Sequence, residues 1–321
     1  MLFRSYAFAS LPHVGAPADD IAAGRRALSL ARGEGYLGFT RNGWQETLGV
    51  HMTSGAPEQL IVLPRPTYLP LCTALATGAA ALAMLFQFYL LSLAAALVTA
   101  GLFVLAGQRA GLARDYGPLP VGHGVSLPPH TEAAGAPPWW ALIFTLLADG
   151  TIFASLVFGT FYLWIAAPNW PAAVAPAPSL TLALVTLAAL AVAAAAARGS
   201  LRALAAGRSV RGWTGFAMLA LVAAIVGAVV LIGGVAPPPH EHALGATAAA
   251  LLGYVALHAG IGLLFLVSNL LRLGAGLVSP RRSLDLHLTR LWLDYTLVTG
   301  AIALGLVLAL PALVAMLGAR P

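Results

Sequence analysis

Long apolar segments separated by short polar ones dominate the chain. A bilayer core about 30 Å thick is crossed by about 20 apolar helical residues, each adding about 1.5 Å. Residues 67–107 form one apolar block about twice that length. The block is broken near Gln87 and Tyr89, which predicts a tight hairpin of two spans. Five further segments of spanning length follow at 139–165, 180–197, 213–235, 246–271 and 290–313.

This pattern predicts an all-α fold, namely a polytopic membrane helical bundle of seven transmembrane helices. We expect a two-helix hairpin plus a five-helix bundle. The predicted parts are a cytoplasmic tail (1–66), the hairpin (67–107), a cytoplasmic loop (108–138) and the five-helix bundle (139–321). Within the tail, an Asp pair followed by spaced apolar residues predicts a short surface helix over 19–31.

The loop charges predict an orientation, because basic residues collect in cytoplasmic loops. All 17 basic residues are Arg. Six Arg lie in the tail. The loops after the second, fourth and sixth predicted spans hold two, four and three Arg, with Arg290 at the edge of the last loop, whereas the loops after the first, third and fifth spans hold none. Only Arg320 lies on the opposite side. The N-terminus is therefore expected in the cytoplasm and the C-terminus outside.

Composition excludes several classes of protein. The chain is 60% hydrophobic and 9% charged with a mean hydropathy of +0.86, whereas soluble domains are about 25% charged. The pI near 10.0 would suit nucleic acid, but the Arg residues lie between apolar runs and not on one folded face, so no nucleic-acid partner is expected. Cys72 is the only cysteine, which excludes a binuclear copper site, an iron–sulfur cluster and a covalent c-type haem.

Histidine placement argues against a redox centre in this chain. Of eight His, only His258 lies in a predicted span, and haem or copper inside a bundle needs several inward-facing imidazoles. We therefore expect no catalytic residue, no metal site and no cofactor. His240 and His242 could chelate a surface metal, but two His in a short solvated loop are more often only a loop.

Asp149 is the most unusual residue in the apolar segments. It lies near the tenth residue of its span, about 15 Å deep, where a carboxylate costs at least ~2.5 kcal/mol. It is either a proton- or lipid-linked site or a hydrogen-bonded carboxyl that ties helices together. His258 lies at similar depth, and we expect the two to face each other or a lipid-filled cleft. Asp294 lies one turn from Arg290 and predicts an i,i+4 ion pair at the cytoplasmic edge.

In order along the chain, four stretches resemble subunit III of the haem–copper cytochrome c oxidases. They are RPTYLPLCTALATG with LFQFYLL, the third span with Trp140 and Asp149, AAARGSLRAL, and GYVALHAGIGLLFL with His258. The acid is Asp where the family usually has Glu, and the first of two family His is here Val255. In the last span only Asp294 matches by position. The segment before the first span is similar to the linker of fused subunit I–III proteins.

The resemblance implies an accessory, non-redox subunit of a bacterial inner-membrane oxidase. Such a chain would pack on oxidase subunits I and II, bind phospholipids in a cleft between the hairpin and the bundle, and help to sustain proton uptake. Haem and copper are expected in the partner subunits. Arg109, Arg272 and Trp140 lie near the ends of predicted spans and are the expected contacts for lipid headgroups.

Other functions stay open at the level of sequence. The equivalent subunit of a quinol oxidase or a nitric-oxide reductase would share the same helical pattern. A small transporter would show inverted repeats and Gly/Pro-broken helices at matching positions in two halves, and neither is evident. A seven-span receptor has only the span count in its favour.

Overall fold

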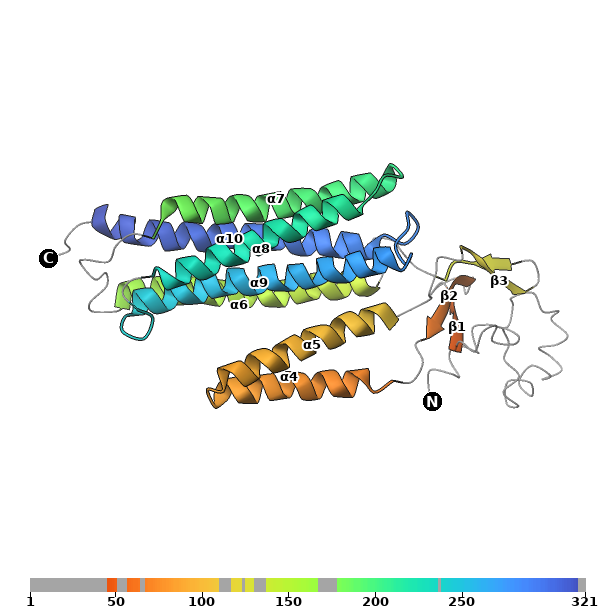
Figure 1. Cartoon of the computed structure of the whole chain (residues 1–321), viewed down its shortest axis with the longest axis horizontal. Helices are drawn as coiled ribbons and strands as arrows, with labels where there is room; N and C mark the ends of the chain where they lie inside the picture. Colours follow the sequence, from red (N-terminus) through yellow and green to blue (C-terminus); the bar gives the residue numbers. More distant parts are fainter. Residues whose placement is uncertain are drawn as a thin grey trace. The chain divides into compact units, whose positions relative to one another are not determined.

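The computed structural model describes residues 45–50, 57–63, 67–109, 117–122, 125–129, 137–166, 178–235 and 238–316. In these ranges the chain is mainly α-helical, with seven helices and four short strands (Figure 1). The surface helix predicted over 19–31 lies outside the described residues. The chain divides into two compact units, one of residues 1–132 with 274–282 and the other of residues 133–273 with 283–321.

Within the described ranges, six helices are long and apolar enough to cross a membrane by length and composition. This finding makes the chain a multi-pass helical membrane protein. Helix α4, Leu69–Leu85, has 17 residues and falls below that length, so the seventh crossing stays a prediction. The six are α5 (Tyr89–Arg109), α6 (Pro137–Ala166), α7 (Leu180–Ala205), α8 (Arg211–Gly233), α9 (Ala243–Gly274) and α10 (Leu284–Met316).

The helical hairpin turns where the sequence predicts it. Gln87 has a φ of 62°, the left-handed conformation that commonly ends an α-helix. In that conformation the Phe88 amide donates to the Ala83 carbonyl at 2.8 Å, which satisfies one of the carbonyls left open at the end of α4. The Ser92 hydroxyl then donates across the hairpin to the Ala80 carbonyl at 2.9 Å.

Two small β-hairpins were not predicted, because the sequence indicated an irregular tail and loop. Strands β1 (Gln45–Val50) and β2 (Pro57–Leu63) pair antiparallel, as do β3 (Leu119–Gly122) and β4 (Val125–Leu127). The Leu60 amide donates to the Pro128 carbonyl at 3.1 Å and joins the two hairpins. The all-α prediction is therefore correct for the apolar segments but incomplete outside them.

The second unit contains α6 to α10, and small residues govern its packing. Helix α7 packs on α8 and on α10, and α10 also packs on α6. A Cβ added at Gly227 of α8 would lie 2.2 Å from Thr186 Oγ1 of α7, and one added at Gly199 would lie 2.5 Å from the Trp213 ring. Close approach between helices depends on small residues in membranes, and Gly227 and Gly199 permit it between α7 and α8.

Candidate functional site

Asp149 and His258 meet between α6 and α9. The Nε2 atom of His258 lies 3.0 Å from Asp149 Oδ2. The His258 side chain is 4% exposed and that of Asp149 is 20% exposed. The predicted pairing of the two residues across helices is confirmed, although 109 positions separate them along the chain.

Two tyrosines complete the polar contacts of the same carboxylate oxygen. The Tyr295 hydroxyl of α10 donates to Asp149 Oδ2 at 2.7 Å, and the Tyr254 hydroxyl of α9 donates to the same oxygen. The two phenolic oxygens are 3.0 Å apart. Asp149 therefore ties three helices together through one oxygen atom, and the buried polar groups have the partners that a low-dielectric site requires.

Aromatic rings hold the imidazole of His258 on two sides. The Tyr254 ring stacks on it at 3.8 Å between centroids, and the Trp292 ring lies parallel to it at 5.2 Å with an interplanar angle of 2°. The Trp292 indole also donates to the backbone carbonyl of His258 at 3.0 Å. These contacts fix the orientation of the ring and present Nε2 to Asp149.

The partners of His258 determine where its protons lie. Nδ1 is 2.9 Å from the Tyr254 carbonyl, which can only accept, so this contact is a hydrogen bond when Nδ1 carries a proton. The contact between Nε2 and Asp149 Oδ2 is a hydrogen bond only if one more proton lies between these two atoms. That proton belongs either to the carboxyl or to an imidazolium. If both contacts of the imidazole are hydrogen bonds, the pair holds one proton more than a neutral imidazole beside a carboxylate.

The arrangement around Asp149 suits proton storage or helix tethering. Among the residues that the structure describes, no three His, Cys, Asp or Glu side chains come together as a ligand set. In the loop before α9, His242 Nδ1 instead accepts from the Leu244 amide at 3.0 Å. The hydrogen-bonded side chains of Asp149 and His258 can hold helices together, and they can take up, share or release a proton.

Tyr254, Tyr295 and Trp292 were not among the predicted site residues. Tyr254 lies one helical turn before His258, so the two side chains share a face of α9. Tyr295 and Trp292 are three positions apart on α10 and likewise share a face. Tyr254 could have been identified from sequence as a polar aromatic residue one helical turn from an intramembrane His. The contribution of α10 depends on how that helix is rotated, which its own sequence does not specify.

A second polar cluster surrounds Asp294. Arg290 Nε lies 3.4 Å from Asp294 Oδ2, which confirms the predicted i,i+4 ion pair. A closer partner was missed, because Arg198 of α7 places Nη2 2.7 Å from Oδ1. That oxygen is buried and lacks a well-aligned hydrogen bond, so the Arg198 contact is an electrostatic pairing. Asp294 thus joins α7 to α10.

The three predicted headgroup residues differ in their surroundings. Arg272 is buried and donates from Nε to Asp285 Oδ2 at 2.7 Å, so its charge already has a partner at the junction of α9 and α10. Arg109 is exposed in the last turn of α5. Trp140 is exposed near the start of α6, where its ring meets Trp139 edge to face. Contact of these residues with lipid stays a prediction.

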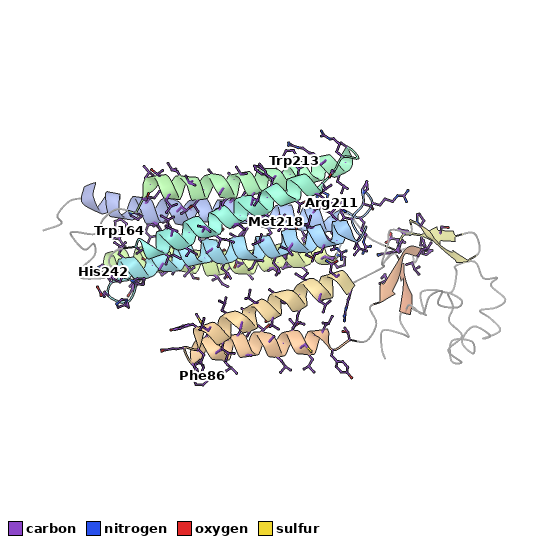
Figure 2. The ribbon with its side chains drawn as sticks, viewed as in Figure 1. Phe86, Trp164, Arg211, Trp213, Met218 and His242 are labelled. Carbon is purple, nitrogen blue, oxygen red and sulfur yellow. The ribbon has the colours of Figure 1, made fainter. Side chains whose placement is uncertain are left out.

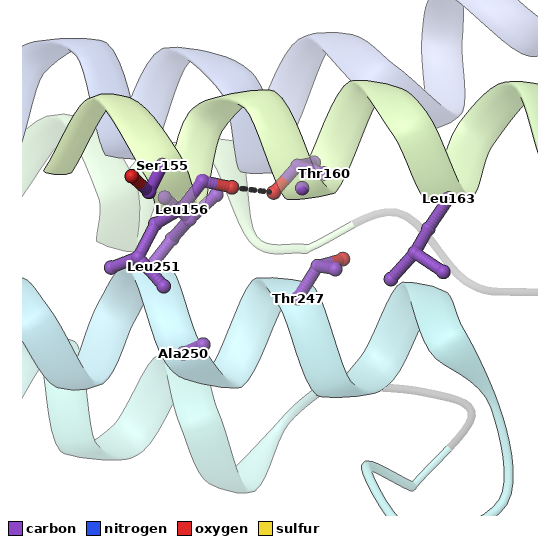
Figure 3. Close-up of a pocket in the computed structure, with 8 residues that line it drawn as sticks. Ser155, Leu156, Thr160, Leu163, Thr247, Ala250 and Leu251 are labelled. Carbon is purple, nitrogen blue, oxygen red and sulfur yellow. Dashed lines mark hydrogen bonds between the residues drawn. The ribbon is translucent and has the colours of Figure 1, made fainter. Parts of the chain in front are cut away.

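An apolar pocket of about 200 Å³ lies between α6 and α9, beyond the polar site (Figure 3). Leu156 and Leu251 line it, and the Thr160 hydroxyl points back to donate to the Leu156 carbonyl at 2.9 Å. No charged residue is among those that line the pocket.

The comparisons with known proteins add no family assignment. No protein-family model matches the chain, and no curated protein matches its sequence.

Proposed function

We propose that this chain is an accessory, non-redox subunit of a respiratory haem–copper terminal oxidase, equivalent to subunit III. In this proposal it spans the bacterial inner membrane seven times with a cytoplasmic N-terminus and a periplasmic C-terminus. It packs against subunits I and II, binds phospholipids and supports proton uptake during oxygen reduction. The haem and copper groups belong to the partner subunits.

One observation supports the proposal above all others. The resemblance singles out an acid in the third span and a His in the sixth, and these two residues form a hydrogen-bonded pair 3.0 Å apart. Two polar residues placed by chance on separate spans would each need its own partner, because unpaired polar groups are costly in hydrocarbon. Their direct pairing is expected if both belong to one site.

The pair has two roles in the proposed subunit. As a tether, it fixes α6, α9 and α10 around one carboxylate oxygen. As a proton-holding group, it gives the bundle an exchangeable proton away from either membrane surface. The first role maintains the shape of the subunit, and the second is consistent with support of proton uptake by neighbouring subunits.

Purification of the membrane complex tests the proposal directly. The full chain, tagged and expressed at its natural level, should co-purify in mild detergent with a haem-containing subunit that mass spectrometry and optical spectra identify. A partner with a two-Cys copper domain would identify cytochrome c as the electron donor. A haem-containing partner without that domain would favour a quinol oxidase or a nitric-oxide reductase.

Variants of Asp149 then separate the two roles. Asp149→Asn keeps the size of the side chain and an acceptor oxygen but cannot hold a carboxylate charge. If the proton matters, the assembled oxidase should form normally but lose activity faster during sustained turnover. The control is Thr151→Val. Thr151 lies two residues after Asp149 on α6, and its hydroxyl donates only to its own helix. Isolation of the chain without any haem protein would contradict the proposal.

A further inference from the structure

We propose that the turn between α7 and α8 is a binding site for one anionic phospholipid. Arg202, Arg208 and Arg211 are all exposed there, and none forms an ion pair among the residues that the structure describes. Arg198, on the same helix as Arg202, is by contrast neutralised by Asp294. The turn therefore carries three uncompensated positive charges within ten residues, from 202 to 211.

An exposed apolar surface continues from these charges along α8. Arg211, Gly215, Leu219, Val222 and Val226 follow each other at three- and four-residue steps, which places them on one face of the helix. Leu219, Val222 and Val226 are exposed on that face, with Leu219 71% exposed. A cationic end followed by an uncovered apolar face matches the two parts of a phospholipid, a phosphate and its acyl chains.

The apolar face of α8 is long enough to cover the acyl chains of one leaflet. Trp213 lies in the first turn of α8, is 46% exposed and rests against Gly199 of α7, and indole rings favour the membrane interface. Figure 2 shows Trp213 and Arg211 at the same end of α8. From Trp213 to Val226 the helix rises about 20 Å, which is more than half of a hydrocarbon core of about 30 Å.

Two glycines leave room for the headgroup region. A Cβ added at Gly212 or at Gly215 would meet nothing within 4 Å. Neither glycine is therefore required for packing inside this chain, although Gly within a helix costs about 1 kcal/mol relative to Ala. Open space over both positions lets a phosphate and its glycerol approach the helix backbone between Arg211 and the apolar face.

Charge and apolar surface together favour a lipid over other anions. A free phosphate would use the guanidinium groups but not Leu219 or Val222. An acidic protein segment would use the charges from the aqueous side and would leave the same apolar face uncovered. A phospholipid of net negative charge satisfies both parts at once. The inference requires only that α8 lies in a membrane, and it is independent of the oxidase partners proposed above.

The test measures lipid binding to the full-length chain in mild detergent. Native mass spectrometry would follow titration with phosphatidylglycerol and, separately, with phosphatidylcholine of the same acyl chains. The unaltered chain should prefer phosphatidylglycerol. Arg208→Gln with Arg211→Gln should weaken phosphatidylglycerol binding about 25-fold, at about five-fold per Arg, and leave phosphatidylcholine binding unchanged.

Matched variants separate the effect of the Arg charges from the effect of the open space at Gly215. Arg208→Lys with Arg211→Lys keeps both charges and should stay within about three-fold of the unaltered chain, because Lys also binds phosphate as a point charge. Gly215→Leu keeps the charges but fills the open space, so it should weaken binding of phosphatidylglycerol. Gly101→Leu, at a helical glycine of α5 that is equally open, should have no effect. Helicity and elution volume show that each variant is folded.

Three results would overturn the proposal. The first is an unchanged affinity for phosphatidylglycerol in the double Gln variant. The second is displacement of bound lipid by excess inorganic phosphate, which would indicate a site for small anions. The third is an acidic protein that co-purifies with the unaltered chain and is lost from the double Gln variant while lipid binding is retained.

Discussion

Replacement of Asp149 by Leu tests whether the carboxylate is a stabilising tether. Leu has the same number of side-chain heavy atoms as Asp, although it is bulkier, and it accepts no hydrogen bond. The change removes the common acceptor of three side chains, namely Tyr254, Tyr295 and His258. All three contacts cross between helices, so their loss should weaken the association of α6 with both α9 and α10.

The expected loss can be worked out from these contacts. Hydrogen bonds between transmembrane helices average about 0.6 kcal/mol in measured cycles and reach about 1.7 kcal/mol at most. Three average bonds give a loss of about 2 kcal/mol for Asp149→Leu. Tyr295→Phe removes one donor and should cost about 0.6 kcal/mol. Asp149→Asn retains one acceptor oxygen and should fall between these values.

Reversible unfolding of the full chain by SDS in mixed micelles, followed by helicity, would measure these differences. Thr151→Val is the control, because the Thr151 hydroxyl donates only to the Ala148 carbonyl of its own helix. The effects of Asp149→Leu and Tyr295→Phe should not add in the double variant, since both remove the same contact. Asp149→Leu with the stability of the unaltered chain would refute the tether.

Three further predictions concern packing, cofactors and topology. Gly227→Ala should lose about 1–3 kcal/mol of stability in the same unfolding assay, because its Cβ would overlap Thr186. Gly215→Ala, which meets nothing, should be neutral or stabilising. The chain purified alone should lack haem and copper, and stoichiometric metal by elemental analysis with a haem absorption band would contradict this. Reporter fusions should place the N-terminus in the cytoplasm and the C-terminus outside, and the reverse result would overturn the span assignment.

The helices were predictable because the membrane imposes a length and a composition on each. The apolar segment at 180–197 became α7, and the polar break at Gln87 became the turn between α4 and α5. The β-hairpins were not predictable in the same way. The strands within each hairpin are neighbours in sequence, with Gln45 opposite Leu63, but short mixed segments show no periodicity that reveals this pairing.

In the candidate site, the sequence indicates how deep a residue lies in the membrane but not toward which neighbouring helix its side chain points. Asp149 and His258 could be paired from sequence because a residue's position along its span gives its depth. Tyr295 and Arg198 could not be assigned, because each reaches its carboxylate only through the rotation of its own helix about its axis. Helix rotation is set by packing against neighbours, and no single span encodes it.

The hydrogen bond from the Trp292 indole to the His258 carbonyl has a mechanical consequence. It joins a side chain of α10 to the backbone of α9, and a backbone atom cannot adjust by changing rotamer. A slip of α10 by one residue would move its donor about 1.5 Å along the helix axis, beyond the length range of a good hydrogen bond. The two helices are therefore locked in register at this level. An axial shift of α10 would therefore strain this bond or displace the backbone of α9 at His258.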